Sequence, residues 1–246
     1  QETQMAIERG FTLSLPGRSR RDVEEVVHLH EAIKYLETLA QSDVAITEFE
    51  LREIHALILG KGDKDAGRYR EHVVEISNAP HKPPHPIHVP QKMTELATWL
   101  RQTTGISAPL VAAVAHAWLA HIHPFGDGNG RTSRAMMNLI LMRRGFPIVL
   151  IRKSDRQRYY EALRYSDEGD IGPFVELVTE RSRDSLKQIE RIRAATIGVT
   201  NALTKVREAE ERSFRVWQAG IDLLLSTIEQ TLRDIEKQDG SYRVFI

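Results

Sequence analysis

Apolar residues recur every three or four positions along most of the chain, and this period constrains the fold more than any other feature. Residues 19–41 illustrate it, with one apolar face formed by Val23, Val26, Val27, His30 and Ile33. Such spacing is typical of an amphipathic helix that buries one face. The same pattern predicts helices over residues 47–59, 91–102, 108–122, 131–144, 155–166 and 172–195. We therefore predict an all-α fold, built as a helical bundle.

Residues 47–60 also carry end signals. Thr47 and Glu50 have the spacing of a capping box, in which each side chain bonds to the backbone N–H of the other residue. Gly60 follows the last apolar residue of the pattern, where helices commonly end. We expect a helix that begins just after Thr47 and ends before Gly60.

One segment, residues 67–90, breaks the helical pattern. It reads GRYREHVVEISNAPHKPPHPIHVP, with β-favouring residues at Val73, Val74 and Ile76 and five prolines after them. Prolines and turn residues interrupt helices, whereas short alternating stretches favour strands. We predict one small β-hairpin, or flap, at about residues 70–80.

Residues 186–246 differ from the rest of the chain. An apolar seam on a long predicted helix is formed by Trp217, Ile221, Leu224, Ile228, Leu232 and Ile235. Two interpretations remain open: the seam packs on the same chain, or it joins two copies in a homodimer.

Composition excludes several classes of function. The chain has 34 basic and 34 acidic residues and no cysteine. Balanced charge gives no direct sign of nucleic-acid binding, and the lack of cysteine rules out disulfides, thiolate catalysis and cysteine-ligated zinc. The apolar runs are shorter than the roughly 18 residues of a membrane span. We expect no membrane association and a cytoplasmic location.

The stretch HPFGDGNGRTSR, residues 123–134, concentrates the polar chemistry of the chain between two predicted helices. A Walker loop and a dinucleotide fingerprint both follow a strand, and none is predicted here. An EF-hand fails because Arg131 and Asn138 occupy positions that need oxygen ligands and a glutamate. The chain also lacks the paired histidines and intervening glutamate of a zinc protease. An anion site remains.

The composition of this stretch fits phosphate chemistry. Its glycines let the backbone approach a ligand, and the amides that open the following helix favour an anion. Arg131 and Arg134 add permanent positive charge one turn apart. Asp127 would repel a bare phosphate but suits a bridging magnesium ion, and His123 can accept a proton near neutral pH. Together these groups favour phosphoryl or nucleotidyl transfer.

HPFGDGNGRTSR resembles the signature of the Fic family, His-x-Phe-x-Asp/Glu-Gly-Asn-Gly-Arg-x-x-Arg, at every defining position. The resemblance extends over roughly residues 3–180, and it implies a Fic-type bundle with a hairpin flap and a C-terminal helical extension. Most Fic enzymes transfer AMP from ATP to a hydroxyl of a target protein. By motif position, His123 would be the general base and Asp127 would hold Mg²⁺ or Mn²⁺.

The resemblance assigns the remaining site residues as well. Gly128, Asn129 and Gly130 would cradle the phosphates, with Arg131 on the β-phosphate and Arg134 on the γ-phosphate. Tyr159 and Tyr160 would flank the adenine, while Asp167 stands where relatives often carry asparagine. The flap would bind the target by adding a strand to it, through Val73, Val74, Glu75 and Ile76.

QMAIERG near the N-terminus is similar to the inhibitory helix of Fic proteins. The resemblance implies that Glu8 pairs with Arg134 and blocks productive ATP binding. Gln4 and Arg9 depart from the usual Ser/Thr and Gly/Asn of that motif. The implied domains are an inhibitory helix and linker (residues 1–20), a catalytic domain (21–185) and a helical extension (186–246).

Three functions follow from these expectations. The first is an autoinhibited protein adenylyltransferase that modifies a Ser, Thr or Tyr hydroxyl of a target protein. The second is the reverse activity, removal of AMP from a target. The third is a regulatory module that binds nucleotide without catalysis, which the complete motif with His123 disfavours.

Overall fold

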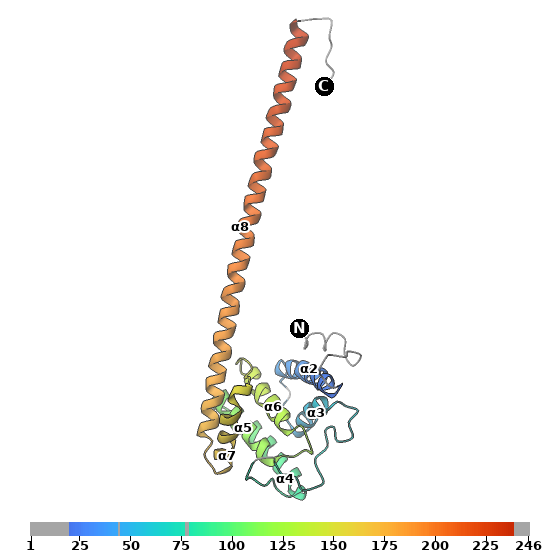
Figure 1. Ribbon diagram of the computed structural model, residues 1–246, viewed down its shortest axis with the longest axis vertical. Helices are drawn as coiled ribbons and strands as arrows, with labels where there is room; N and C mark the ends of the chain where they lie inside the picture. The colour runs from blue at the N-terminus through green and yellow to red at the C-terminus, as the bar shows by residue number, and fades with distance from the viewer. Residues whose placement is uncertain (1–19, 44, 77–78, 239–246) are drawn as a thin grey trace. The chain divides into compact units, whose positions relative to one another are not determined.

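The computed structural model describes residues 20–43, 45–76 and 79–238, drawn as helices and connecting loops in Figure 1. The chain divides into two compact units, residues 1–187 and 188–246. The described residues form helices, short 3₁₀ turns and loops but no strand, so the predicted all-α class is confirmed. The helices run in the order α2 Arg20–Ala40, α3 Glu48–Leu59, α4 Val89–Gln102, α5 Ala108–Ile122, α6 Asn129–Arg143, α7 Arg156–Asp167 and α8 Gly172–Gln238.

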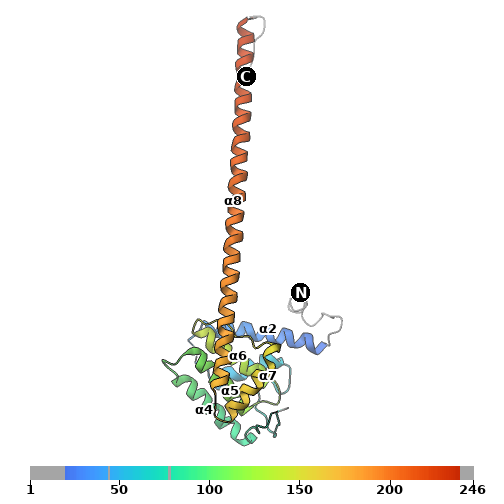
Figure 2. The ribbon, with the colours of Figure 1, turned by 60° about the vertical axis from the view of Figure 1, so that its left-hand side comes forward.

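Helices α5 and α6 form the centre of the first unit. They pack against each other, α5 also contacts α4 and α7, and α6 contacts α2 and α3; the views of Figures 1 and 2 both place them side by side. The α5 sequence explains its position, since alanines and aliphatic residues cover most of its surface and the majority are buried. A helix that is apolar all round is stable only when neighbours surround it.

Helix α3 begins as the sequence predicts. The Thr47 N–H donates to Glu50 Oε2 at 2.8 Å, and Phe49 N–H donates to Thr47 Oγ1 at 3.2 Å. These bonds satisfy donors that the first helical turn leaves without partners. The helix then buries Leu51, Ile54 and Ile58 against the core, which fixes the face that points toward the α5–α6 connection.

The segment between α3 and α4 is irregular apart from a 3₁₀ turn at Pro86–His88. The hairpin predicted at residues 70–80 is therefore not confirmed. A strand needs a partner whose N–H groups pair with it, and the prolines at positions 80, 83 and 84 have none to offer. The described part of the segment is held by a side chain instead, as shown below.

Helix α8 begins in the first unit, where Phe174, Leu177 and Val178 are fully buried. In the second unit, by contrast, described apolar side chains such as Leu203 and Trp217 are more than 60% exposed. Of the predicted seam, Trp217 and Ile221 have described side chains, and the other four lie outside that set. Among the described helices, none has a stretch that is both long enough and apolar enough to cross a membrane.

Candidate active site

The loop between α5 and α6 begins with a residue in an uncommon backbone conformation. His123 closes α5 with φ 50° and ψ 58°, and it is the one non-glycine among the described residues with positive φ. This left-handed conformation costs an L-residue roughly 1–2 kcal/mol, so the surrounding contacts must stabilise it. Strained residues of this kind gather at functional sites.

Asn129 braces the loop from inside. Its side chain is buried; Oδ1 accepts the Phe125 N–H and Nδ2 donates to the Phe125 carbonyl, both at 2.9 Å. These two bonds leave one N–H of Nδ2 for a further contact, in addition to the backbone N–H of Asn129. The predicted cradle residue is thus also the residue that holds the loop closed.

Gly128 is required both by its backbone angle and by its neighbours. It has φ 79°, and a Cβ atom there would lie 2.7 Å from Leu59 Cδ1 and 3.2 Å from His55 Nε2. Gly128 is also the N-cap of α6, so the loop approaches α3 as closely as the backbone permits. The N–H groups of Asn129, Gly130 and Arg131 follow it in the first helical turn, where a helix lacks its own acceptors.

His55 on α3 is a second brace, which the sequence analysis did not identify. Its ring is fully buried and stacks on Phe125 with centroids 3.7 Å apart. The Gly67 N–H donates to Nδ1 at 3.0 Å, so the ring proton is on Nε2, which donates to the Asp127 carbonyl at 3.0 Å. Burial also lowers the pKa of His55, which keeps the ring neutral and both bonds intact.

Arg70 ties the loop to the segment before α4. The buried guanidinium donates from Nε to the His123 carbonyl at 2.8 Å, and its terminal nitrogens donate to the carbonyls of His72 and Pro84 at 3.0 and 2.6 Å. Its backbone N–H donates to the Pro124 carbonyl at 2.9 Å. The Arg70 side chain therefore holds together the two ends of residues 72–84, a contact that sequence patterns do not reveal.

The ring of His123 is oriented for proton transfer. Nδ1 lies 3.3 Å from the Ala120 carbonyl, and a carbonyl can only accept, so Nδ1 carries the proton and Nε2 the lone pair. Burial lowers the pKa of His123, with a smaller contribution of the same sign from the charge of Arg70. At neutral pH the ring is therefore an unprotonated base.

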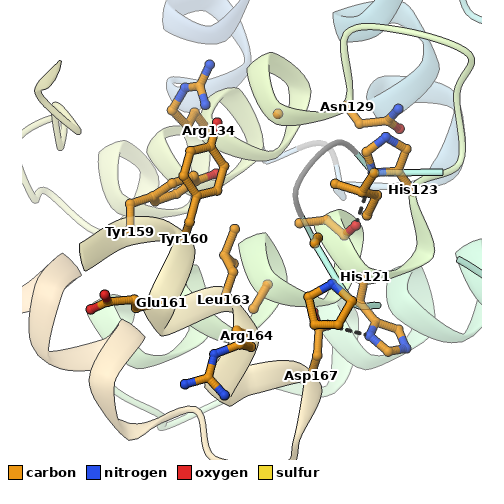
Figure 3. Close-up of a pocket in the computed structure, with 16 residues that line it drawn as sticks. His121, His123, Asn129, Arg134, Tyr159, Tyr160, Glu161, Leu163, Arg164 and Asp167 are labelled. Carbon is orange, nitrogen blue, oxygen red and sulfur yellow. Dashed lines mark hydrogen bonds and ion pairs between the residues drawn. The ribbon is translucent and has the colours of Figure 1, made fainter. Parts of the chain in front are cut away.

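A cavity of about 370 Å³ brings several predicted residues together, within the roughly 300–1,000 Å³ of small-molecule pockets. Figure 3 shows Arg134 beside the two tyrosines at one side, with His123 and Asn129 at the other. The predicted residues that line it are His123, Asn129, Gly130, Arg134, Tyr159, Tyr160 and Ile76. Asp127, Gly128, Arg131 and residues 73–75 are not part of this lining.

Arg134 is held by a buried network. Its guanidinium donates a hydrogen bond to the Tyr159 hydroxyl, and that hydroxyl lies 3.3 Å from His116 Nε2. Burial, with the charge of Arg134, lowers the pKa of His116 to about 3, so the ring is neutral; its Nε2 shares a hydrogen bond with the Tyr159 hydroxyl, and its buried Nδ1 has no partner among the described residues. His116 was not predicted; a histidine inside the apolar run of α5 was the available signal, because a buried polar group needs a partner.

The two tyrosines that are expected to flank the adenine differ in exposure. Tyr159 is 6% exposed and Tyr160 is 54% exposed. Tyr159 therefore combines a ring on the cavity wall with a hydroxyl that orients Arg134. Tyr160 presents its ring to the open side, where a planar base could stack.

Asp127 and Arg131 lie at the outer edge of the loop. Asp127 Oδ1 accepts the Gly128 N–H at 2.6 Å, and Oδ2 lies 3.5 Å from an Arg131 nitrogen, with the Asp127 side chain 64% exposed. Arg131 also faces Glu25 of α2 at 3.7 Å. Magnesium is usually bound by one or two carboxylates together with substrate phosphates, so this exposed carboxylate fits the ion.

The predicted target-binding residues lie in the segment that Arg70 closes. Val73 is 65% exposed, and neither it nor its neighbours up to Ile76 pair with another strand. The predicted inhibitory Glu8 lies outside the described residues.

Comparison with known proteins agrees with this geometry. The Fic/DOC family matches residues 45–141, which span α3 to α6 and the loop between the last two. A protein adenylyltransferase Fic of Nematostella vectensis is 44% identical over 180 residues, which are 70% of this chain and 42% of that protein. The chain belongs to the Fic/DOC family. A homologue of the same name from Aedes aegypti is 40% identical over 190 residues, 74% of this chain and 36% of that protein.

Solved Fic structures share the fold. Fic-1 from C. elegans has a TM-score of 0.70 and 34% identity, covering 78% of this chain and 58% of that one. A Fic-domain protein of Bacteroides thetaiotaomicron has a TM-score of 0.69 at 26% identity, covering 75% of this chain and 76% of that one. The chain spans about two fifths of the curated Fic relatives given above, 42% and 36% of their lengths.

Proposed function

We propose that this Fic domain transfers AMP from ATP to a Ser, Thr or Tyr hydroxyl of a target protein. The observation that carries the proposal is the single cavity that joins an unprotonated His123 to Arg134 and to the first turn of α6. A base, an arginine and helix amides around one cavity match the needs of nucleotidyl transfer. The related Fic proteins named protein adenylyltransferase support the same reaction.

The reaction can be written with the residues of this chain. The target hydroxyl oxygen attacks the α-phosphorus of ATP, the bond to the bridging oxygen of the β-phosphate breaks, and pyrophosphate leaves. His123 Nε2 takes the hydroxyl proton, because Nδ1 already carries one. The amides of Gly130 and Arg131, with Arg134, would hold the phosphates in line, and positioning of this kind is a large part of catalysis.

Asp127 would hold Mg²⁺ or Mn²⁺ as part of the same site. The ion would neutralise charge on the phosphates. Within the chain, the Gly128 N–H fixes Asp127 Oδ1, which orients the carboxylate before any ion arrives. Activity should therefore disappear in excess chelator.

Residues 73–76 would present the target. These residues form no strand with another described segment. The Ile76 carbonyl accepts the Ala79 N–H, and a target segment could pair with the remaining N–H and C=O groups. Backbone pairing tolerates many side chains, so the mode defines an extended segment as the substrate rather than one sequence. The carbonyl bonds of Arg70 link this segment to His123, which would set the hydroxyl against the base.

The direct experiment compares ATP labelled on the α-phosphate with ATP labelled on the γ-phosphate, using a lysate as the source of targets. Transfer of the α-label alone is expected. Transfer of the γ-label would indicate phosphorylation and overturn the proposal. Binding of nucleotide without transfer of either label, by the unaltered chain and by the Glu8→Gly variant alike, would also overturn the proposal, because the domain would then be a binding module.

We further propose that Glu8 inhibits transfer by pairing with Arg134, as the N-terminal motif implies. The Glu8→Gly variant should raise α-label transfer by about tenfold or more, the factor that corresponds to about 1.4 kcal/mol of lost inhibition. Glu8→Gly combined with His123→Ala should be silent, which separates catalysis from artefact. Equal labelling by Glu8→Gly and the unaltered chain would exclude Glu8 as the inhibitor.

A further inference from the structure

Three side chains from distant parts of the sequence meet at one edge of the cavity. They are His81 from the segment before α4, His121 near the end of α5 and Asp167 at the end of α7. The ligand atoms that they offer all lie within 4.8 Å of one another. Figure 3 shows the contact between His121 and Asp167, whose Nδ1 and Oδ1 are 2.7 Å apart. We propose that this cluster is a binding site for a divalent transition metal such as Zn²⁺, separate from the magnesium position at Asp127.

The orientation of His81 is the first support. Its Nε2 lies 2.9 Å from the His121 carbonyl, and since a carbonyl accepts only, Nε2 carries the ring proton. The lone pair of the neutral ring is then on Nδ1, which faces Asp167 Oδ1 at 4.0 Å. A metal ion bound by the Asp167 carboxylate would meet this lone pair. Histidine ligands of metals typically donate their other N–H to a backbone carbonyl, as His81 does.

The packing of the cluster is the second support. The His81 and His121 rings stack with centroids 3.9 Å apart, and the side chains of His81 and Asp167 are 11% and 23% exposed. Metal–ligand bonds of about 2.0–2.2 Å separate ligand atoms by roughly 3–3.5 Å. The separations of His121 and His81 from Asp167 are 2.7 and 4.0 Å, and all three pairs lie within 4.8 Å, so the side chains would have to rotate to complete the coordination.

The ligand types select the ion. Two imidazoles and one carboxylate suit Zn²⁺ and neighbouring transition metals, whereas Mg²⁺ prefers oxygen ligands throughout. Three protein ligands leave a fourth position for water or another group, as in open zinc sites. His121 would move its proton from Nδ1 to the exposed Nε2, so that a neutral ring can bind.

The site would fasten three elements together. His81 lies in the segment that Arg70 closes, His121 is two residues before His123, and Asp167 lines the cavity. An ion here would hold residues 79–85 against α5 and α7, next to His123, the proposed general base. This inference does not depend on AMP transfer, because metal binding is measurable without nucleotide.

The test is a Zn²⁺ titration by calorimetry of chelator-treated full-length chain, without nucleotide and with excess Mg²⁺ to occupy oxygen sites. In a parallel titration with Co²⁺, the visible absorption spectrum reports whether the ion has nitrogen ligands. We expect one tight site per chain, which His81→Ala and Asp167→Asn each weaken by more than the roughly 10–100-fold typical of losing an outer-shell partner. Asp167→Asn keeps the size of the side chain, and its helix content can be verified by circular dichroism.

Matched controls make the result specific. His88→Ala removes an exposed histidine of the nearby 3₁₀ turn, and Asp127→Ala removes the proposed magnesium ligand; both should bind Zn²⁺ as tightly as the unaltered chain. Zn²⁺ should also slow amide hydrogen exchange in residues 79–85, and not in Asp167→Asn. No tight site, or equal affinity in the His81 and Asp167 variants, would overturn the proposal.

Discussion

The loop at residues 123–130 and the neighbouring segment at residues 72–76 are held in opposite ways. The loop is braced by buried side chains at two points, with Asn129 bonded to Phe125 and His55 bonded to the Asp127 carbonyl. The segment forms no strand, and its Val73 is 65% exposed. Arg70 bonds to the loop at the His123 carbonyl and to the segment at the His72 carbonyl, and it also bonds to the Pro84 carbonyl beyond the segment.

This difference matches two demands on one site. Proton and phosphoryl chemistry need atoms fixed to within a fraction of an ångström, which buried and satisfied polar groups provide. Recognition of a protein segment by its backbone needs open N–H and C=O groups. The braced loop at residues 123–130 and the exposed segment at residues 72–76 would meet these two demands of the proposed transfer.

The largest expected effect tests the chemistry of the loop. His123→Ala should lower AMP transfer by about 10²–10⁴-fold, the usual contribution of a general base, with nearly unchanged ATP affinity. The imidazole acts on the incoming hydroxyl and not on the nucleotide. Label transfer and ATP titration check the two parts. A variant with more than about a tenth of the original rate would remove His123 from this role.

The brace is tested by Asn129→Ala, which leaves the buried Phe125 N–H and carbonyl without their partner. Each unsatisfied buried group costs about 1–3 kcal/mol, so the loss of both partners should lower the free energy of unfolding by roughly 2–6 kcal/mol. Urea unfolding measures this loss. Asn129→Asp keeps the acceptor for the Phe125 N–H and should lose less stability than the alanine variant. Equal stability of all three chains would show that the loop is not held by this amide.

Acid titration tests the burial of His123. Its pKa is lowered by burial, so the neutral base persists as the pH falls through the ordinary histidine value of about 6.5. We expect kcat/KM for the target to decline on acidification with a midpoint below that value. The pH profile of transfer with a purified target measures it. A midpoint at or above about 6.5 would contradict the assigned base.

The smallest effect is expected in the open segment. Val73→Ala should change stability by less than about 0.5 kcal/mol, because its side chain is exposed. Val73→Pro and Val74→Pro each remove one N–H, and in a paired strand alternate residues bond to a given partner. One of the two should lower kcat/KM for the target by roughly 2- to 12-fold, the value of one hydrogen bond of about 0.5–1.5 kcal/mol. Unchanged kcat/KM in both would exclude strand addition here.

The sequence could predict those parts of the site whose residues lie close together in the chain. His123, the glycines and Arg134 lie within twelve residues between two helices, so their proximity follows from the chain itself. The helices were predicted for a similar reason, since apolar period and caps such as Thr47–Glu50 act over a few residues. The roles of all the predicted site residues, His123 and Arg134 included, stay predictions, although the positions of those in the loop and at Tyr159 and Tyr160 are now described.

The hairpin at residues 70–80 shows where local pattern stops being informative. Val73, Val74 and Ile76 favour an extended backbone, but pairing depends on a partner that the pattern does not specify. Arg70 supplies a different closure through the carbonyls of His72, Pro84 and His123, of which the last is 53 positions away.

The sequence by itself therefore determined the helical class and the motif at residues 123–134 that indicates the family, because both depend on residues that are near neighbours in the chain. Only the tertiary structure brought His55 beneath the loop, joined His116 to Tyr159, and assembled His81, His121 and Asp167. These contacts join residues 40 or more positions apart. Such pairs meet because the packing of α3, α5, α6 and α7 places their helices together, and that packing is a property of the whole core rather than of any one segment.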